Sequence, residues 1–121
     1  MGAGKDSADE IRKRVRRKLE VLVKASGAAT MLGALLLERE VKQYITDHDI
    51  IDTGRLRASY TAQSAGETSA VMGTNVEYAP DLEYGTSHQR AQPHLYPVFE
   101  ANKDKVTKLI ADRLKAALKD G

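Results

Sequence analysis

The chain has 121 residues, which favours a single domain, and it carries a net charge of only +2. Hydrophobic residues make up 41% of it, but 16 of them are Ala, and Leu, Ile, Val and Phe together supply about a fifth of the chain. This composition predicts a thin core that completes its burial against a partner or against copies of itself. The absence of Cys excludes disulfides and a thiol nucleophile, and without an unbroken run of about 18 apolar residues we expect no membrane span.

The charge is distributed unevenly along the chain. Residues 1–24 hold eight Lys and Arg against four Asp and Glu, whereas the remaining residues hold eleven against thirteen. The basic character therefore belongs to the segment 12–24 and not to the whole protein.

A long helix is predicted over residues 7–46, after a flexible N-terminus at 1–6. Ser7 and Glu10 have the spacing of a capping box. An apolar stripe at helical spacing then runs from Ile11 to Ile45 and is interrupted only by two Gly. The pattern is compatible with one helix or with two that meet at a kink near Gly27. A helix of about 52 Å is longer than so small a globule can cover. One end should therefore project, fold back at Gly27 or pack on another subunit.

The central segment, residues 52–96, is predicted to form a small antiparallel sheet and a short helix. Asp52, Thr53 and Gly54 suggest a turn with a short helical turn after it. Residues 56–63 and 69–73 have the character of two strands joined by a hairpin connection. A short helix is expected within 76–84, because Pro80 suits a first turn and Gly85 suits a C-cap.

The C-terminal segment is predicted to be a helix over residues 97–119. Residues 92–97 should be extended, because a residue before Pro is disfavoured in the helical region, and Pro97 then fits the first turn. The order helix, small sheet, helix makes residues 1–121 one α+β domain.

The basic segment of the first helix is a candidate DNA-facing surface. Its candidate contacts to phosphate are Arg12, Lys13, Arg16 and Arg17. The alternative interpretation is a solvated or protein-binding helix face, since no aromatic residues are interleaved to stack bases. Both interpretations stay open at this point.

An enzyme is not expected from this sequence, and neither is a cofactor. The three His do not form a helical metal-binding pair, and the Asp47-His48-Asp49 run is typical of a solvated turn. No Ser lies in a Gly-x-Ser-x-Gly elbow. The aromatic residues Tyr78, Tyr84, Tyr96 and Phe99 are expected to form the core beneath a polar loop at 86–92.

Four short stretches together resemble a known family. They are Asp52-Thr53-Gly54-Arg55-Leu56-Arg57-Ala58-Ser59, Gly73-Thr74-Asn75-Val76-Glu77-Tyr78-Ala79, Leu82-Glu83-Tyr84-Gly85-Thr86-Ser87 and Gln92-Pro93-His94-Leu95-Tyr96-Pro97. In this order and spacing, residues 52–101 resemble the neck and tail-completion proteins of long-tailed bacteriophages, the head–tail connector family that includes lambda minor tail protein Z. The aromatic residue before Gly85 conforms to the family pattern, whereas His94 stands where Phe is common.

The resemblance implies a structural protein of the virion that forms a homo-oligomeric ring at the head–tail junction. Its partners would be head-completion and tail-terminator or tail-tube proteins, with DNA only as the passing genome and no membrane. It would reside in the host cytoplasm during assembly. The residues that carry the motifs, with structural or subunit-contact roles, are Asp52, Thr53, Gly54, Arg55, Leu56, Arg57, Glu83, Tyr84, Gly85, Thr86, Gln92 and Pro93.

Glu83 is expected to have a specific partner. A carboxylate near the C-terminus of a short helix faces the wrong end of the helix dipole, and its apolar neighbours make it costly unless it is hydrogen-bonded. Arg55 and Arg57 are the predicted partners, within the subunit or across the ring interface.

Overall fold

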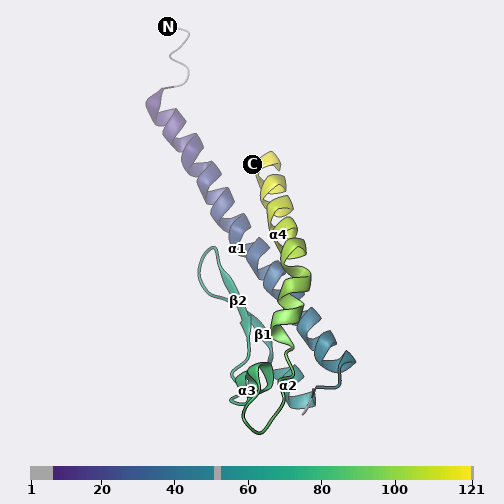
Figure 1. Ribbon diagram of the computed structural model, residues 1–121. Coiled ribbons are helices and arrows are strands. Elements are labelled where there is room, and N and C mark those ends of the chain that lie inside the picture. The colour runs from purple at the N-terminus through teal and green to yellow at the C-terminus, as the bar shows by residue number, and fades with distance from the viewer. Residues whose placement is uncertain (1–6, 51–52, 121) are drawn as a thin grey trace.

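The computed structural model describes residues 7–50 and 53–120. Its elements are α1 (Ala8–Asp47), α2 (Thr53–Ser59), β1 (Thr61–Ser64), β2 (Ala70–Gly73), α3 (Ala79–Tyr84) and α4 (Leu95–Asp120). Helices α1 and α4 lie side by side and run in opposite directions (Figure 1). The β1–β2 hairpin packs on the other flank of α1, and the short helices α2 and α3 lie at the base of the molecule. The predicted α+β architecture is confirmed. The predicted flexible N-terminus, residues 1–6, lies outside the described residues, as does Asp52.

Helix α1 is unbroken, so the alternative of a kink near Gly27 is wrong. The predicted cap is present, with the Ser7 hydroxyl accepting from the Glu10 N–H at 3.2 Å. The two Gly serve as points of close approach instead. A Cβ on Gly27 would overlap the carbonyl oxygen of Glu67 in the hairpin loop, and a Cβ on Gly33 would come within 2.9 Å of Val106 Cγ1 on α4. Small residues at these positions let the hairpin and α4 reach the helix.

The hairpin is shorter than the sequence predicted. Residues 56–59 belong to α2, where Leu56 is fully buried in the core, so their assignment to a strand is wrong. Strands β1 and β2 pair antiparallel with Thr61 opposite Gly73 and Ser64 opposite Ala70. The first strand is also tied to α1, because the Ala62 N–H donates to Glu38 Oε1 at 2.7 Å. A side chain of the long helix therefore continues the hydrogen bonding of the sheet.

Helix α4 begins at Leu95, two residues before the predicted start, so Leu95–Pro97 is helical and not extended. Pro97 still lies in the first turn, where a missing N–H costs nothing. Helix α3 has Pro80 in its first turn and ends at Gly85, whose φ of 79° confirms the predicted need for Gly. Gly54, which the sequence placed in a turn, lies in α2 and does not have a positive φ.

The core gathers at the lower end of the molecule, where α1 meets α2, α3 and the start of α4. Its buried residues are Val41, Ile45, Ile50, Leu56, Tyr60, Ala79, Leu82 and Val98. At the other end, every residue from Ala8 to Glu20 is exposed, and α1 extends beyond the end of α4 (Figure 1). We call residues 8–20 the arm and the rest of the described chain the body. The prediction that one end of the long helix projects is confirmed.

One segment of α1 concerns the expectation that the chain has no membrane-spanning helix. Although apolar residues do not run unbroken, α1 contains an 18-residue window that is long and apolar enough to cross a membrane by length and composition. Core helices of soluble proteins and N-terminal signal sequences pass the same test. In this chain α4 and the hairpin pack along the same helix, so its apolar face has protein partners over part of its length.

Candidate functional site

Glu83 organises the junction between α3 and α4. Its carboxylate accepts hydrogen bonds from the backbone N–H groups of His94 at 3.1 Å, Leu95 at 2.9 Å and Tyr96 at 3.0 Å. These are N–H groups of the first turn of α4, which have no partner within their own helix. The last turn of α3 therefore caps the helix that follows, and the carboxylate faces the positive end of that dipole.

The prediction that Arg55 or Arg57 pairs with Glu83 is therefore wrong within the subunit. Arg55 lies 4.0 Å from Glu77 and places its guanidinium 5.2 Å from the centre of the Tyr78 ring. Arg57 donates to the Thr46 hydroxyl at 2.9 Å. The sequence indicated that Glu83 needs a partner. Because the last helix was predicted to begin at residue 97 and not at Leu95, the N–H groups of its first turn were not recognised as that partner.

Two buried rings lie beside this carboxylate. His94 is completely buried, with Nε2 2.7 Å from the Tyr60 hydroxyl and Nδ1 3.1 Å from the Gln92 carbonyl and 3.3 Å from Glu83. Burial raises the pKa of Tyr60 to about 12, with a further contribution from the charge of Glu83. Burial also works to raise the pKa of Glu83, but the hydrogen bonds from Leu95, Tyr96 and His94 outweigh it and hold that pKa below its usual value.

The loop from Gly85 to Gln92 brings the two helices together. Gly85 N–H donates to Asp81 O at 2.8 Å, and Gln92 N–H donates to Leu82 O at 2.6 Å. A Cβ on Gly85 would approach Ala91 N within 2.9 Å. Thr86 closes the loop through its N–H to Gln89 O at 2.9 Å. Glu83, Gly85, Thr86 and Gln92 thus form one junction, while Tyr84 and Pro93 are exposed beside it.

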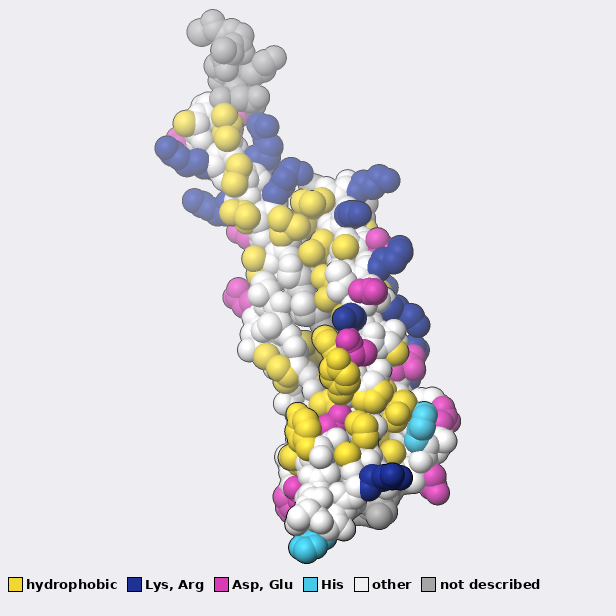
Figure 2. All heavy atoms as spheres, viewed as in Figure 1, with side chains coloured by type: hydrophobic (Ala, Val, Ile, Leu, Met, Phe, Trp, Pro, Cys, Tyr) yellow, Lys and Arg dark blue, Asp and Glu magenta, His cyan; other side chains and the backbone are white. Residues whose placement is uncertain are grey.

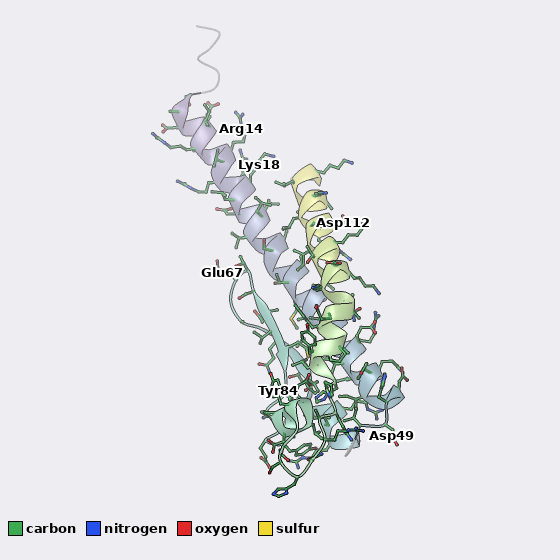
Figure 3. All side chains as sticks on the ribbon, in the orientation of Figure 1. Arg14, Lys18, Asp49, Glu67, Tyr84 and Asp112 are labelled. Carbon is green, nitrogen blue, oxygen red and sulfur yellow. The ribbon has the colours of Figure 1, made fainter. Side chains whose placement is uncertain are left out.

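Of the four aromatic residues predicted to form a core beneath the loop, Tyr78 packs against the core, and the prediction is wrong for the other three. Tyr84, Tyr96 and Phe99 are 82%, 64% and 49% exposed. Residues of this size and type are enriched where proteins meet. Figure 2 shows hydrophobic side chains gathered over this part of the surface, and Figure 3 shows Tyr84 at the base of the molecule, below the hairpin.

An open apolar groove continues upward from these rings. It lies between the hairpin and α4, has α1 as its floor, and encloses about 540 Å³. The floor is formed by Thr30, Gly33, Leu37 and Val41 among others. The walls include Ser69, Ala70 and Met72 from the hairpin and Leu95, Phe99, Val106 and Ile110 from α4. Below, we refer to this feature as the groove.

The arm carries a second uncovered apolar surface. Ile11, Val15 and Leu19 form a stripe with Arg12 and Arg16 directly beside it. Lys13 and Arg17 are also four residues apart, but they form a separate row turned by about 100° from that of Arg12 and Arg16. The four predicted DNA-facing residues are all exposed, and these two neighbouring rows lie within about 140° of the helix circumference.

Among the described residues, no group of three or more His, Asp or Glu is placed to hold a metal ion. His48 caps the C-terminus of α1 and stacks on Tyr44 with ring centroids 3.7 Å apart. Asp49 follows with a φ of 49°, in the left-handed region that Asp tolerates. The predicted turn at 47–49 is confirmed as the end of the helix.

Comparison of the chain with protein-family models, with curated proteins and with solved structures gives no match. The functional conclusion therefore depends on the motifs of the sequence and on the uncovered surfaces of the fold.

Proposed function

We propose that the chain is a structural and assembly protein of a bacteriophage virion, acting as a homo-oligomeric ring at the head–tail junction. It is a neck or tail-completion protein in this proposal, with head-completion and tail-terminator or tail-tube proteins as its neighbours. It works in the host cytoplasm during assembly and then in the virion, without an enzymatic activity, a cofactor or a membrane.

The observation that carries the proposal is the amount of apolar surface that the single chain leaves uncovered. Tyr84, Tyr96 and Phe99 are exposed at the base, and Ile11, Val15 and Leu19 are exposed on the arm. Contiguous apolar surfaces of this kind mark sites of protein–protein contact. A subunit whose burial is completed by its neighbours suits a structural assembly better than it suits an isolated binding module.

The motifs support the particular assembly. Glu83, Gly85 and Thr86, with the backbone of Gln92, form the compact α3–α4 junction, and Leu56 is fully buried beneath it in the core. The resemblance to neck and tail-completion proteins is carried by these same stretches. Their joint role in positioning α4, a wall of the groove, links the motifs to the surface that neighbours would contact.

The test is deletion of the gene from the phage or prophage genome that encodes it. We expect DNA-filled heads and separate tails that fail to join, visible by negative-stain electron microscopy, with joining restored by the gene supplied in trans. Normal joined particles from the deletion strain would contradict the proposal.

A second candidate is a small nucleic-acid-binding protein that uses the arm. It is favoured by the exposure of Arg12, Lys13, Arg16 and Arg17 on a projecting helix. Reversal of Arg12, Arg16 and Arg17 to Glu should then reduce the salt dependence of DNA affinity by about 0.9 in log–log slope per lost phosphate contact. Sub-micromolar DNA affinity at physiological salt, lost in that variant, would favour this candidate over the first.

A further inference from the structure

We infer that the arm of one copy docks in the groove of the next copy, so that the chain assembles head to tail. The inference deepens the proposed function, on which it rests for the ring, by naming the two surfaces that meet. The occupant of the groove is a helix of this same protein, presenting Ile11, Val15 and Leu19.

The arm stripe and the groove floor lie on one continuous face of α1. From Ile11 to Val41 the positions follow spacings of four and three residues, through Leu19, Thr30 and Gly33. Over the body this face is covered on both sides by the hairpin and α4, which leave the groove between them. Over the arm the same face has no cover among the described residues. One helix therefore carries an exposed apolar stripe at one end and forms the floor of the groove at the other.

The arm cannot reach its own groove. Helix α1 is continuous from Ala8 to Asp47, and an unbroken helix holds its two ends apart at 1.5 Å per residue. A fold-back at Gly27 is absent, and the carbonyl of Glu67 sits against that position. Any arm that fills the groove must therefore come from another molecule.

The groove suits a helix better than a small ligand. Its lining is mostly apolar, from Gly33 and Leu37 at the floor to Val106 and Ile110 on one wall. Ligand sites usually add a few convergent polar groups that fix orientation. Here Glu83 lines the groove, but its carboxylate is already engaged by three backbone N–H groups. An amphipathic helix needs only the apolar surface, which it contacts with residues at i, i+4 and i+8.

The arm is basic, whereas the rest of the chain carries a small excess of acidic groups. Arg12 and Arg16 border the arm stripe, and residues 1–24 carry eight basic against four acidic groups. The remaining chain carries eleven basic against thirteen acidic groups. The Glu83 carboxylate at the lower end of the groove is already engaged by backbone N–H groups, but Glu67 is exposed in the hairpin loop, near α1 (Figure 3). The exposed rings of Tyr84 and Tyr96 at the lower end add faces on which a guanidinium can stack.

Because the arm and the groove are different surfaces, the contact between copies is heterologous. Contacts of this type close into a ring when the rotation permits and otherwise extend into a filament. A ring at a head–tail junction is the closed form of the same contact.

Cross-linking of the full chain tests the contact directly, since the absence of native Cys leaves only introduced thiols. Val15→Cys on the arm is mixed with Ser69→Cys on the groove wall, and a short bis-maleimide is added. We expect a covalent dimer in the mixture. The matched control is Lys13→Cys, on the opposite side of the arm helix, which should give little product with Ser69→Cys.

Sedimentation of point variants gives an independent measure at about 100 μM, where even a micromolar interface is saturated. Val15→Glu places a charge in the stripe and should weaken self-association more than about tenfold. Lys13→Glu changes the net charge more but leaves the stripe intact, and it should still assemble. Helix content by circular dichroism should be the same in both, because both positions are exposed.

Three outcomes would overturn the inference. They are a wild-type chain that is monomeric at this concentration, self-association unchanged by Val15→Glu, and cross-links of Val15→Cys only to itself, which would indicate arm-to-arm pairing. Failure here is distinguishable from failure of the proposed function. A ring that survives Val15→Glu would refute the contact alone, whereas joined particles from the deletion strain would refute the function alone.

Discussion

The arm and the part of α1 that lies in the body have the same pattern of residues but opposite environments. Val15 and Val41 both lie on the apolar face of α1, yet Val15 is 52% exposed and Val41 is completely buried. The body has α4 and the hairpin against that face, and the arm has neither. The periodicity of a sequence therefore specifies which face is apolar, while the length of the neighbouring elements decides which part of the face is covered within the subunit.

The difference also separates two sources of stability. The body is held by burial and by the Glu83 junction, whereas the arm depends on local helix propensity, on its Ser7 cap and on exposed pairs such as Arg12–Asp9 at 3.1 Å. Exposed ion pairs contribute little, and isolated short helices are marginal in water. We therefore expect the arm to be the least stable part of α1 until a neighbour covers it.

The strongest test of this comparison is a Val→Ala substitution made once in the arm and once in the buried part of α1. Val41→Ala removes buried methyl groups and leaves a cavity, so it should lower the free energy of unfolding by about 2–3 kcal/mol. Val15→Ala should change it by less than about 0.5 kcal/mol, because the side chain is exposed in the monomer. Urea denaturation at a concentration where the chain is monomeric checks both. Equal losses would show that the arm is packed within the subunit.

A second test concerns the capping carboxylate. Glu83→Gln keeps one acceptor but loses the charge at the start of α4, which should cost about 1–3 kcal/mol at neutral pH. Glu67→Gln, on the exposed hairpin loop, should cost almost nothing. The same denaturation measurement applies, and indistinguishable midpoints for the two variants would remove the special role of Glu83.

The junction also predicts a pH dependence. The pKa of Glu83 is held below 4.5 in the folded chain, so its contribution to stability is present at neutral pH and is lost as the pH falls through that lowered pKa. Glu83→Gln should therefore make stability less sensitive to acid than in the wild type. Unfolding curves between about pH 7 and pH 3 measure this, and parallel profiles for the two proteins would contradict it.

Substitutions at Gly27 and Gly54 test where the body requires a glycine for close contact between elements. Gly27→Ala should destabilise the chain by about 1–3 kcal/mol, because the added methyl group overlaps the backbone of the hairpin loop. Gly54→Ala meets no atom of the described residues within 4 Å and lies in α2, so it should stabilise the chain by up to about 1 kcal/mol. Thermal unfolding of the two variants should thus shift in opposite directions. A neutral Gly27→Ala would show that the hairpin loop moves freely over α1.

The last prediction concerns how stability at alkaline pH depends on Tyr60. Its folded pKa is raised from 10.0 to about 12, so its contribution is present below pH 10 and is lost as the pH rises from 10 toward 12. In Tyr60→Phe this part of the alkaline loss should be absent. Stability measured between about pH 9 and pH 11.5 checks the slope, and an unchanged slope would place the Tyr60 hydroxyl in water.

Much of the fold was predictable because local signals agree with it. The capping box at Ser7, the helical stripe of α1, the Pro80–Gly85 pair and the stripe of α4 each depend on residues near in sequence. Their elements are present with ends within a few residues of those predicted. The strand predicted over 56–63 is wrong at residues 56–59, where Leu56 is buried as part of a helix, because a short apolar segment fits either period.

The site was less predictable for a physical reason. The sequence by itself determined that Glu83 requires a partner, that Gly85 requires a positive φ and that the basic charge is confined to one segment. Only the tertiary structure decided that the partner is the first turn of α4, that Tyr84, Tyr96 and Phe99 face outward, and that a groove separates the hairpin from α4. These facts depend on how elements that are separate in sequence pack against one another. The hairpin loop and α4 approach α1 closely at Gly27 and Gly33, and no local pattern specifies those contacts.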